Sequence, residues 1–138
     1  MPKKRILIVD DDVSGTCLLK VSLEKTEKFE VRTENLGARG LSAAREFRPD
    51  LILLDVVMPD KDGGDVAFHI QSDRTLCDTP IVFLTSLVTD HEAGAALLPG
   101  FHFIAKPASV PRLTERIEKI IADREEARHL ARTSQAPA

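Results

Sequence analysis

The chain has 138 residues, 43% of them hydrophobic and 30% charged, and a formal net charge of -3 at pH 7. This length and composition are typical of one globular domain with a core of its own. No apolar run is long enough to cross a bilayer or to form the core of a secretory signal, and no basic region offers a surface to nucleic acid. We therefore expect a cytoplasmic protein that binds neither membranes nor, by itself, nucleic acid.

The amino-terminal part alternates strand and helix patterns. Residues 5–9 are an aliphatic run ended by acids, which is typical of a parallel strand covered on both faces. A helix is predicted at about 13–25, with Asp12 or Ser14 as its N-terminal cap. Residues 29–33 alternate apolar and polar side chains, which indicates a second strand near an edge of the sheet.

The same alternation continues to the end of the chain. Three more strands are predicted, at 50–55, 80–85 and 101–105. Four more helices are predicted, at 36–47, around 66–70, at 90–98 and from Val110 onward, the last with Leu113, Ile117, Ile120 and Ile121 on one face. Five strands alternating with five helices predict a parallel α/β sheet with right-handed crossovers, helices on both faces and a ligand site at the carboxyl ends of the strands.

Carboxylates follow two of the predicted strands. Asp10, Asp11 and Asp12 end the first strand and Asp55 ends the third, so these side chains meet if the two strands are neighbours. Close carboxylates repel one another unless a cation neutralises them. Mg²⁺ takes one or two carboxylates and leaves positions for waters and a phosphate oxygen, which suits this cluster better than Ca²⁺ with its larger ligand number.

Two other polar residues end the remaining core strands. Thr85 ends the fourth strand with a hydroxyl donor, and Lys106 ends the fifth with an ammonium group. An aspartate carboxylate such as Asp55 can attack phosphorus, and catalysis then consists mainly of positioning and charge neutralisation. Each residue alone also fits a structural role, as a cap, a strand terminus or a solvated lysine, but their joint position favours phosphoacceptor chemistry.

These motifs resemble those of the response regulator receiver domains of two-component signal transduction. The resemblance covers about residues 5–122 and implies a single-domain, chemotaxis-type regulator with a flavodoxin-like, doubly wound five-stranded sheet of order 2-1-3-4-5 and five helices. The residues that carry it are Ile6-Leu7-Ile8-Val9-Asp10-Asp11-Asp12, Leu53-Leu54-Asp55-Val56-Val57-Met58-Pro59, Asp62-Gly63, Leu84-Thr85-Ser86 and Lys106-Pro107.

The resemblance also implies roles for individual residues. It implies that Asp55 takes a phosphoryl group from a histidine kinase or a histidine phosphotransfer protein, and that this switches the binding of a downstream partner or output domain. Such a protein assists its own phosphotransfer and dephosphorylation but is not an enzyme. The implied magnesium ligands are Asp11, Asp55 and the backbone carbonyl of Val57, with Asp10 acting through water. The implied switch pair is Thr85 and Phe103. The resemblance also implies a cis peptide bond between Lys106 and Pro107.

The chain departs from the receiver pattern near the switch. The loop from Gly100 to Phe103 is one residue shorter than in most receivers, and Phe103 lacks the hydroxyl of tyrosine, so it fits an ordinary core position equally well. Val57 and Leu87 stand two residues after the phosphoacceptor and the threonine, and both are apolar. We expect them to exclude the attacking water and to slow hydrolysis of the acyl phosphate.

Two other functions compete with the phosphoacceptor interpretation. A phosphohydrolase of the aspartyl-phosphate type would carry a second aspartate two residues after the nucleophile, where this chain has Val57. A phosphorylation-independent scaffold with the same fold would typically lose an acid, the threonine or the lysine, and all of these are present. Both alternatives are therefore disfavoured.

The remaining features concern the tail, the cysteines and the histidines. Residues 123–132 are helix formers of mixed charge that extend the last helix beyond a domain of 1–122, and 133–138 are expected to be disordered. A partner contact, a homodimer contact or a linker to an output domain are alternatives for this extension. The cysteines, Cys17 and Cys77, are predicted to be free and buried. The histidines are predicted to lie at surface or boundary positions without a metal: His69, His91, His102 and His129.

Overall fold

The computed structural model describes residues 2–85, 102–106 and 109–134 of the chain. Its centre is a five-stranded sheet of order β2-β1-β3-β4-β5 in which every pairing is parallel. The strands are β1 (Lys4–Val9), β2 (Phe29–Glu34), β3 (Leu51–Leu54), β4 (Ile81–Thr85) and β5 (His102–Ala105). The predicted strand order and the edge position of β2 are confirmed.

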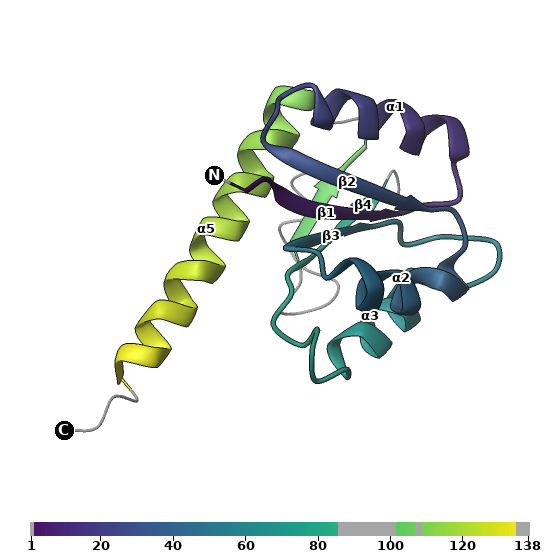
Figure 1. Cartoon of the computed structure of the whole chain (residues 1–138). Helices are drawn as coiled ribbons and strands as arrows, with labels where there is room; N and C mark the ends of the chain where they lie inside the picture. The colour runs from purple at the N-terminus through teal and green to yellow at the C-terminus, as the bar shows by residue number, and fades with distance from the viewer. Residues whose placement is uncertain (1, 86–101, 107–108, 135–138) are drawn as a thin grey trace.

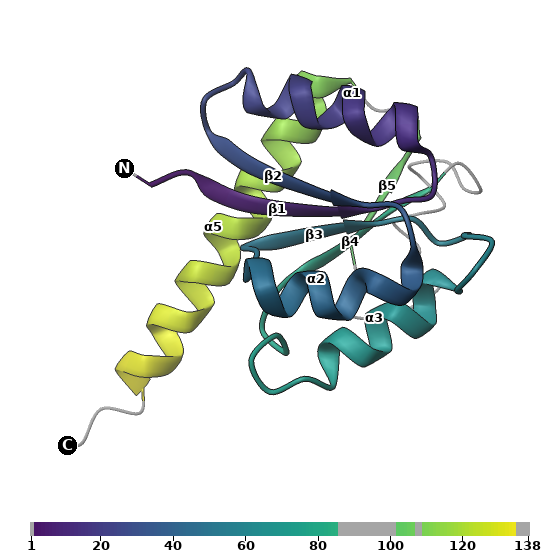
Figure 2. The same cartoon turned by 45° about the vertical axis from the view of Figure 1, so that its right-hand side comes forward.

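Helices cover both faces of this sheet. In the part of the chain that the structure describes, they are α1 (Val13–Glu24), the short 3₁₀ helix η1 (Gly37–Arg39), α2 (Gly40–Phe47), α3 (Gly63–Gln71) and α5 (Val110–Ser134). Helices α1 and α5 lie on one face and α2 and α3 on the other (Figures 1 and 2). The helix predicted at 90–98 falls outside the described residues.

Strand β1 is aliphatic from Ile6 to Val9 because both of its faces are buried. Successive side chains of a strand point to opposite faces. Accordingly, Ile6 and Ile8 join the core under α1 and α5, whereas Leu7 and Val9 join the core under α2 and α3. All four side chains are buried, so a polar residue at any of them would lie in an apolar layer.

Helix α1 begins directly after the acids that end β1. Asp12 is its N-terminal cap, and the Asp12 side chain accepts a hydrogen bond of 3.0 Å from the backbone N–H of Gly15. The structure thus decides between the two predicted caps, Asp12 and Ser14. One of the three consecutive acids is used to start a helix, which leaves Asp10 and Asp11 for the strand end.

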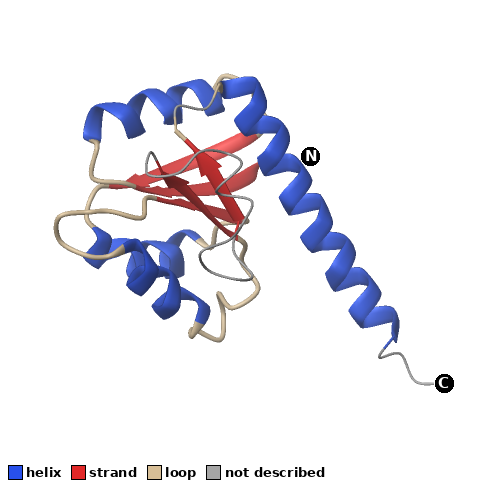
Figure 3. Cartoon of the chain, turned by 180° about the vertical axis from the view of Figure 1, so that it is seen from behind, coloured by secondary structure: helices blue, strands red, loops and turns tan. Residues whose placement is uncertain are grey.

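Helix α5 packs on the sheet through its first half only. Its predicted apolar face is buried, whereas the side chains of residues 122–131 are mostly exposed and the helix projects from the body of the molecule (Figure 3). The prediction of disorder from Thr133 is wrong for Thr133 and Ser134, which are helical. Residues 122–134 are good helix formers without glycine or proline, so nothing local ends the helix earlier.

The exposure of the two cysteines differs from the prediction. Cys17 and Cys77 are both free and exposed, not buried. Cys17 lies on the outer side of α1, because Thr16 and Leu23 occupy the inner side, and Cys77 lies in the turn before β4. The described histidines are exposed as predicted, at 69, 102 and 129, and His91 lies outside the described residues.

No helix within the described ranges is both long and apolar enough to span a membrane.

Candidate functional site

The carboxyl ends of β1 and β3 bring two aspartates side by side. The strands are neighbours in a register that pairs Val9 with Leu54, so Asp10 and Asp55 follow at the same edge. The backbone N–H of Asp55 donates to the carbonyl of Val9 at 2.9 Å. Carboxylate oxygens of Asp10, Asp11 and Asp55 all lie within 4.8 Å of one another, as the strand pattern predicted.

The three carboxylates differ in burial. Asp10 is buried, the Asp55 side chain is 14% exposed, and Asp11 is exposed to solvent. The Asp10 side chain accepts a hydrogen bond of 3.0 Å from the backbone N–H of Asp12. The cluster therefore runs from the interior to the surface, with Asp11 at its open side.

Asn35 supports this cluster and was not predicted from the sequence. Its side-chain amide donates to the backbone carbonyl of Asp10 at 2.7 Å and to the hydroxyl of Thr16 at 3.0 Å. It thereby ties the end of β1 to α1. The signal in the sequence was slight, a single amide residue directly after the second strand.

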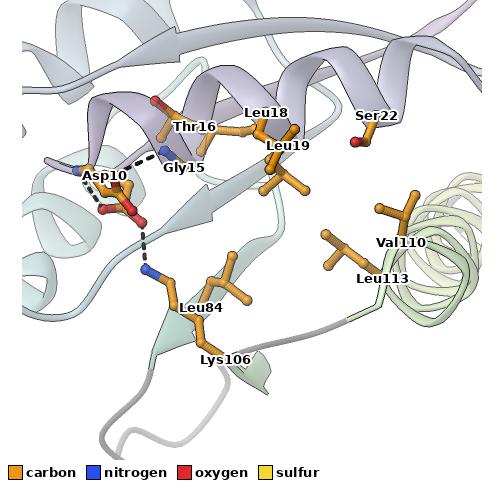
Figure 4. A pocket seen from close by; sticks show the side chains of 12 residues that line it. Asp10, Gly15, Thr16, Leu18, Leu19, Ser22, Leu84, Lys106, Val110 and Leu113 are labelled. Carbon is orange, nitrogen blue, oxygen red and sulfur yellow. Dashed lines mark hydrogen bonds and ion pairs between the residues drawn. The ribbon is translucent and has the colours of Figure 1, made fainter.

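Lys106 brings a cation to the acids from the end of β5. Its ammonium nitrogen lies 2.6 Å from Asp10 Oδ2 (Figure 4). The same nitrogen lies 3.7 Å from Asp55 Oδ2. Burial lowers the pKa of Lys106, but the hydrogen bond and the negative charge of Asp10 outweigh it, so the pKa is raised overall. Lys106 is consequently protonated at neutral pH.

The charge of Asp55 is only partly compensated. Its pKa is raised above the usual value, first by burial and then by the negative charge of Asp10, while the charge of Lys106 opposes the rise. One ammonium group thus faces several carboxylates. A hard divalent cation is the group that such oxygen donors would accept, so the cluster could hold a metal ion.

The segment that follows Asp55 turns back sharply on itself. A bridge pairs Val57 with Asp62, and the N–H of Gly63 donates to the carbonyl of Val56 at 2.8 Å. A Cβ at Gly63 would lie 2.2 Å from the carbonyl oxygen of Asp55, so only glycine permits this approach. Val57 is 58% exposed within this segment. Its backbone lies beside the acidic cluster, because a hydrogen bond from the backbone of Val57 to Asp55 opposes the rise in the pKa of Asp55 that burial causes.

The structure places the two predicted switch residues differently. Thr85 is the last residue of β4 and pairs with Ala105, which puts it at the same sheet edge as Lys106. Phe103 is 8% exposed and stacks on Phe83, with ring centroids 5.2 Å apart. Phe103 therefore packs in the core here. Leu87, Ser86, Gly100 and Pro107 lie outside the described residues.

A groove of about 300 Å³ opens beside the acids, between α1 and α5. Asp10 and Lys106 lie at one end of it, and Leu19, Leu84 and Leu113 lie farther along (Figure 4). The groove therefore has Asp10 and Lys106 at one end and a partly apolar lining between α1 and α5.

Comparison with known proteins matches this chain to one family. The model of the response regulator receiver domain matches residues 6–118. The polar-differentiation response regulator DivK of Brucella anthropi is 33% identical over 124 residues, which cover 89% of this chain and 99% of the relative. DivK of Brucella ovis is 31% identical over 121 residues, covering 87% and 98%.

Solved structures agree with the sequence relatives. A CheY-like response regulator receiver domain protein from Methanospirillum hungatei superimposes with a TM-score of 0.79 at 27% identity, covering 91% of this chain and 99% of its own. A putative response regulator from Chloroflexus aurantiacus gives a TM-score of 0.77 at 27% identity, covering 88% and 99%. The chain belongs to the response regulator receiver domains, the signalling modules of two-component systems.

Proposed function

We propose that Asp55 is the phosphoacceptor of a cytoplasmic signalling regulator and takes a phosphoryl group from the phosphohistidine of a sensor histidine kinase or histidine phosphotransfer protein. The observation that carries this proposal is the cluster of Asp10, Asp11 and Asp55 oxygens within 4.8 Å, with the Lys106 ammonium against it. Phosphorylation then changes the affinity for a downstream protein partner or output domain.

The transfer is a direct displacement at phosphorus. A carboxylate oxygen of Asp55 forms a bond to phosphorus as the P–N bond of phosphohistidine breaks, and the imidazole leaves with the electron pair. Asp55 must be ionised to attack, and Lys106 favours this ionised form. Lys106 can also pair with an oxygen of the transferred group, because its ammonium nitrogen is 3.7 Å from Asp55 Oδ2.

Magnesium is the metal that fits this donor set. We assign Asp11, Asp55 and the backbone carbonyl of Val57 as direct ligands and Asp10 as a ligand through water. When bound, Mg²⁺ supplies positive charge to the carboxylates and to the phosphoryl oxygens. The raised pKa of Asp55 supports the assignment, since it reflects burial and carboxylate charge that such an ion would offset.

Thr85 and Phe103 are proposed to transmit the modification. Thr85 ends β4 at the edge where the phosphoryl group would sit, and Phe103 lies in the neighbouring strand. The hydroxyl of Thr85 would move toward the phosphoryl group and Phe103 would favour its inward position. The packing of Phe103 on Phe83 supports this part of the proposal.

The experiment that tests the function is phosphorylation of the full chain with acetyl phosphate, with and without Mg²⁺, read by intact mass. We expect one phosphoryl adduct that requires Mg²⁺ and disappears in Asp55→Asn, whereas Asp78→Asn, a change at an exposed acid far from the cluster in sequence, retains it. A folded protein that forms no adduct would favour a phosphorylation-independent scaffold. Continuous release of phosphate with no accumulating adduct would favour a phosphohydrolase.

A further inference from the structure

The carboxylate of Asp60 joins the loop after Asp55 to the connection between β2 and α2. Its Oδ1 accepts a hydrogen bond from the backbone N–H of Gly37 at 3.1 Å, and its Oδ2 accepts one from Ala38 at 3.0 Å. Both donors belong to η1, where the first N–H groups of a helix lack partners within the helix. Each oxygen of Asp60 thus satisfies one backbone donor of a segment more than twenty residues away in sequence.

The two segments also touch closely. Gly37 is buried, and a Cβ at this position would lie 2.8 Å from the Cβ of Lys61 and 3.1 Å from the terminal methyl carbon of Met58. Contacts this short exclude a side chain at residue 37 unless the loop shifts. Met58 is itself buried in the core, so residues 58–61 are held against η1 by packing as well as by hydrogen bonds.

Residues 58–61 directly follow the proposed metal site in the chain. Val57, whose carbonyl is assigned as a ligand, precedes Met58 and is three residues before Asp60. Toward its other end, the loop is closed by the bridge between Val57 and Asp62. A chain held at both ends over so few residues has little freedom, so displacing Asp60 would shift the backbone that carries the carbonyl of Val57.

We infer that Asp60 is a positioning residue for the metal site, and that it couples the η1 turn to metal binding through its hydrogen bonds to Gly37 and Ala38. The inference rests on the proposed function, because it takes the acidic cluster to be a magnesium site. Asp60 does not touch the metal. It holds the loop so that the carbonyl of Val57 is in place before the ion arrives, which removes the need to order the loop on binding.

Coupling of this kind is reciprocal. If closure of the Asp60 contacts raises the affinity for Mg²⁺, then Mg²⁺ favours closure of those contacts by the same factor. The amide hydrogens of Gly37 and Ala38 are the donors in these contacts. Mg²⁺ should therefore slow their exchange with solvent, although neither residue is a ligand.

The experiment compares Mg²⁺ binding to the full chain, by isothermal titration calorimetry, in the unchanged protein, Asp60→Ala and Asp73→Ala. Asp73 is the matched control, since it is another carboxylate that accepts a backbone N–H, from Thr75, and also pairs with Arg45. We expect Asp60→Ala to weaken Mg²⁺ binding roughly tenfold, as for other residues that orient metal ligands. Asp73→Ala should leave the affinity within about twofold even if it lowers the melting temperature more.

Hydrogen exchange by NMR supplies the second readout, together with a milder variant. Mg²⁺ should slow exchange at Gly37 and Ala38 in the unchanged protein and have no effect there in Asp60→Ala. Asp60→Asn keeps one acceptor oxygen and replaces the alanine variant if that variant does not fold. We expect it to weaken Mg²⁺ binding in the same direction but by a smaller factor.

Two results would overturn the inference, and they are distinguishable. If the unchanged protein binds no Mg²⁺, the proposed function fails and the coupling fails with it. The other result is that the unchanged protein binds Mg²⁺ while Asp60→Ala and Asp73→Ala have the same Mg²⁺ affinity, or while Mg²⁺ leaves the exchange rates of Gly37 and Ala38 unchanged. In either case the proposed function stands and the positioning role of Asp60 is wrong.

Discussion

Asp55 carries a charge that opposes folding in the metal-free protein. Its pKa is raised by burial and by the charge of Asp10, so the folded state binds the Asp55 proton more tightly than the unfolded chain does. The resulting penalty on stability is absent below the unfolded pKa of about 3.9 and grows as the pH rises through the folded pKa. Ionisation of Asp55 thus lowers the stability of the metal-free folded state.

We expect Asp55→Asn to raise the free energy of unfolding at pH 7, without metal, by about 1 kcal/mol, the usual size of a stabilising substitution. The amide is uncharged at all pH values and does not repel Asp10. Thermal denaturation in the presence of a chelator measures this gain. The difference between the two proteins should shrink as the pH falls toward 4, because Asp55 then becomes protonated.

Magnesium provides the control for the Asp55 prediction. Saturating Mg²⁺ should stabilise the unchanged protein, because a ligand that binds only the folded state raises its stability, and should stabilise Asp55→Asn much less. A variant that is less stable than the unchanged protein at pH 7 would show that Asp55 makes a favourable net contribution to folding.

Val57 is expected to set the lifetime of the acyl phosphate. Val57 lies two residues after Asp55, is 58% exposed and offers no polar side-chain group to an attacking water. Val57→Asn should speed loss of the phosphoryl group roughly tenfold, equivalent to about 1.4 kcal/mol in the barrier. The decay of the phosphorylated form after removal of the donor measures this rate, and an unchanged rate would show that Val57 does not exclude water.

Helix α5 divides into a packed part and a projecting part. Ile117 is fully buried against the sheet, whereas Leu130 is 59% exposed on the same helix. Ile117→Ala should lower the free energy of unfolding by about 2–5 kcal/mol, because it leaves a cavity, and Leu130→Ala should change it by less than about 0.5 kcal/mol. Chemical denaturation of the two variants measures both values, and equal effects would contradict the division.

The sequence patterns predicted the strands more clearly than helix α1. The aliphatic runs of β1 and β3 identify buried parallel strands, because only a strand covered on both faces requires apolar side chains at every position. Helix α1 has a weaker pattern, with Val13, Leu18 and Val21 exposed. Its inner side could not be deduced from periodicity alone, and the prediction that Cys17 is buried is wrong.

We expect the chain as a whole to consist of a receiver domain of residues 1–122 and a helical extension that contributes little to its stability. Arg124 and Arg128 of the extension line a small cavity together with Pro80. An ion pair also joins Lys4 to Glu125, two side chains that are 42% and 53% exposed. Exposed pairs of this kind contribute about 0–1 kcal/mol. The domain of 1–122 should therefore fold without the extension.

A chain ending at residue 122 should melt within a few degrees of the full chain, as expected for a loss of at most about 1 kcal/mol. It should also accept the phosphoryl group at Asp55 in the presence of Mg²⁺. Calorimetry and intact mass measure the two outcomes. A truncated chain that is unfolded would show that residues 123–134 belong to the domain.

Local patterns determined the strands, the helices and the acids, threonine and lysine that follow the strands, because burial and strand ends leave marks on neighbouring residues. Which of these residues meet was decided by tertiary structure. Asp10 lies beside Asp55 because β1 pairs with β3, and Asp60 reaches Gly37 across a separation that leaves no periodic signal. Pairing between distant segments depends on how all the apolar faces are covered together, and no short stretch of sequence encodes that.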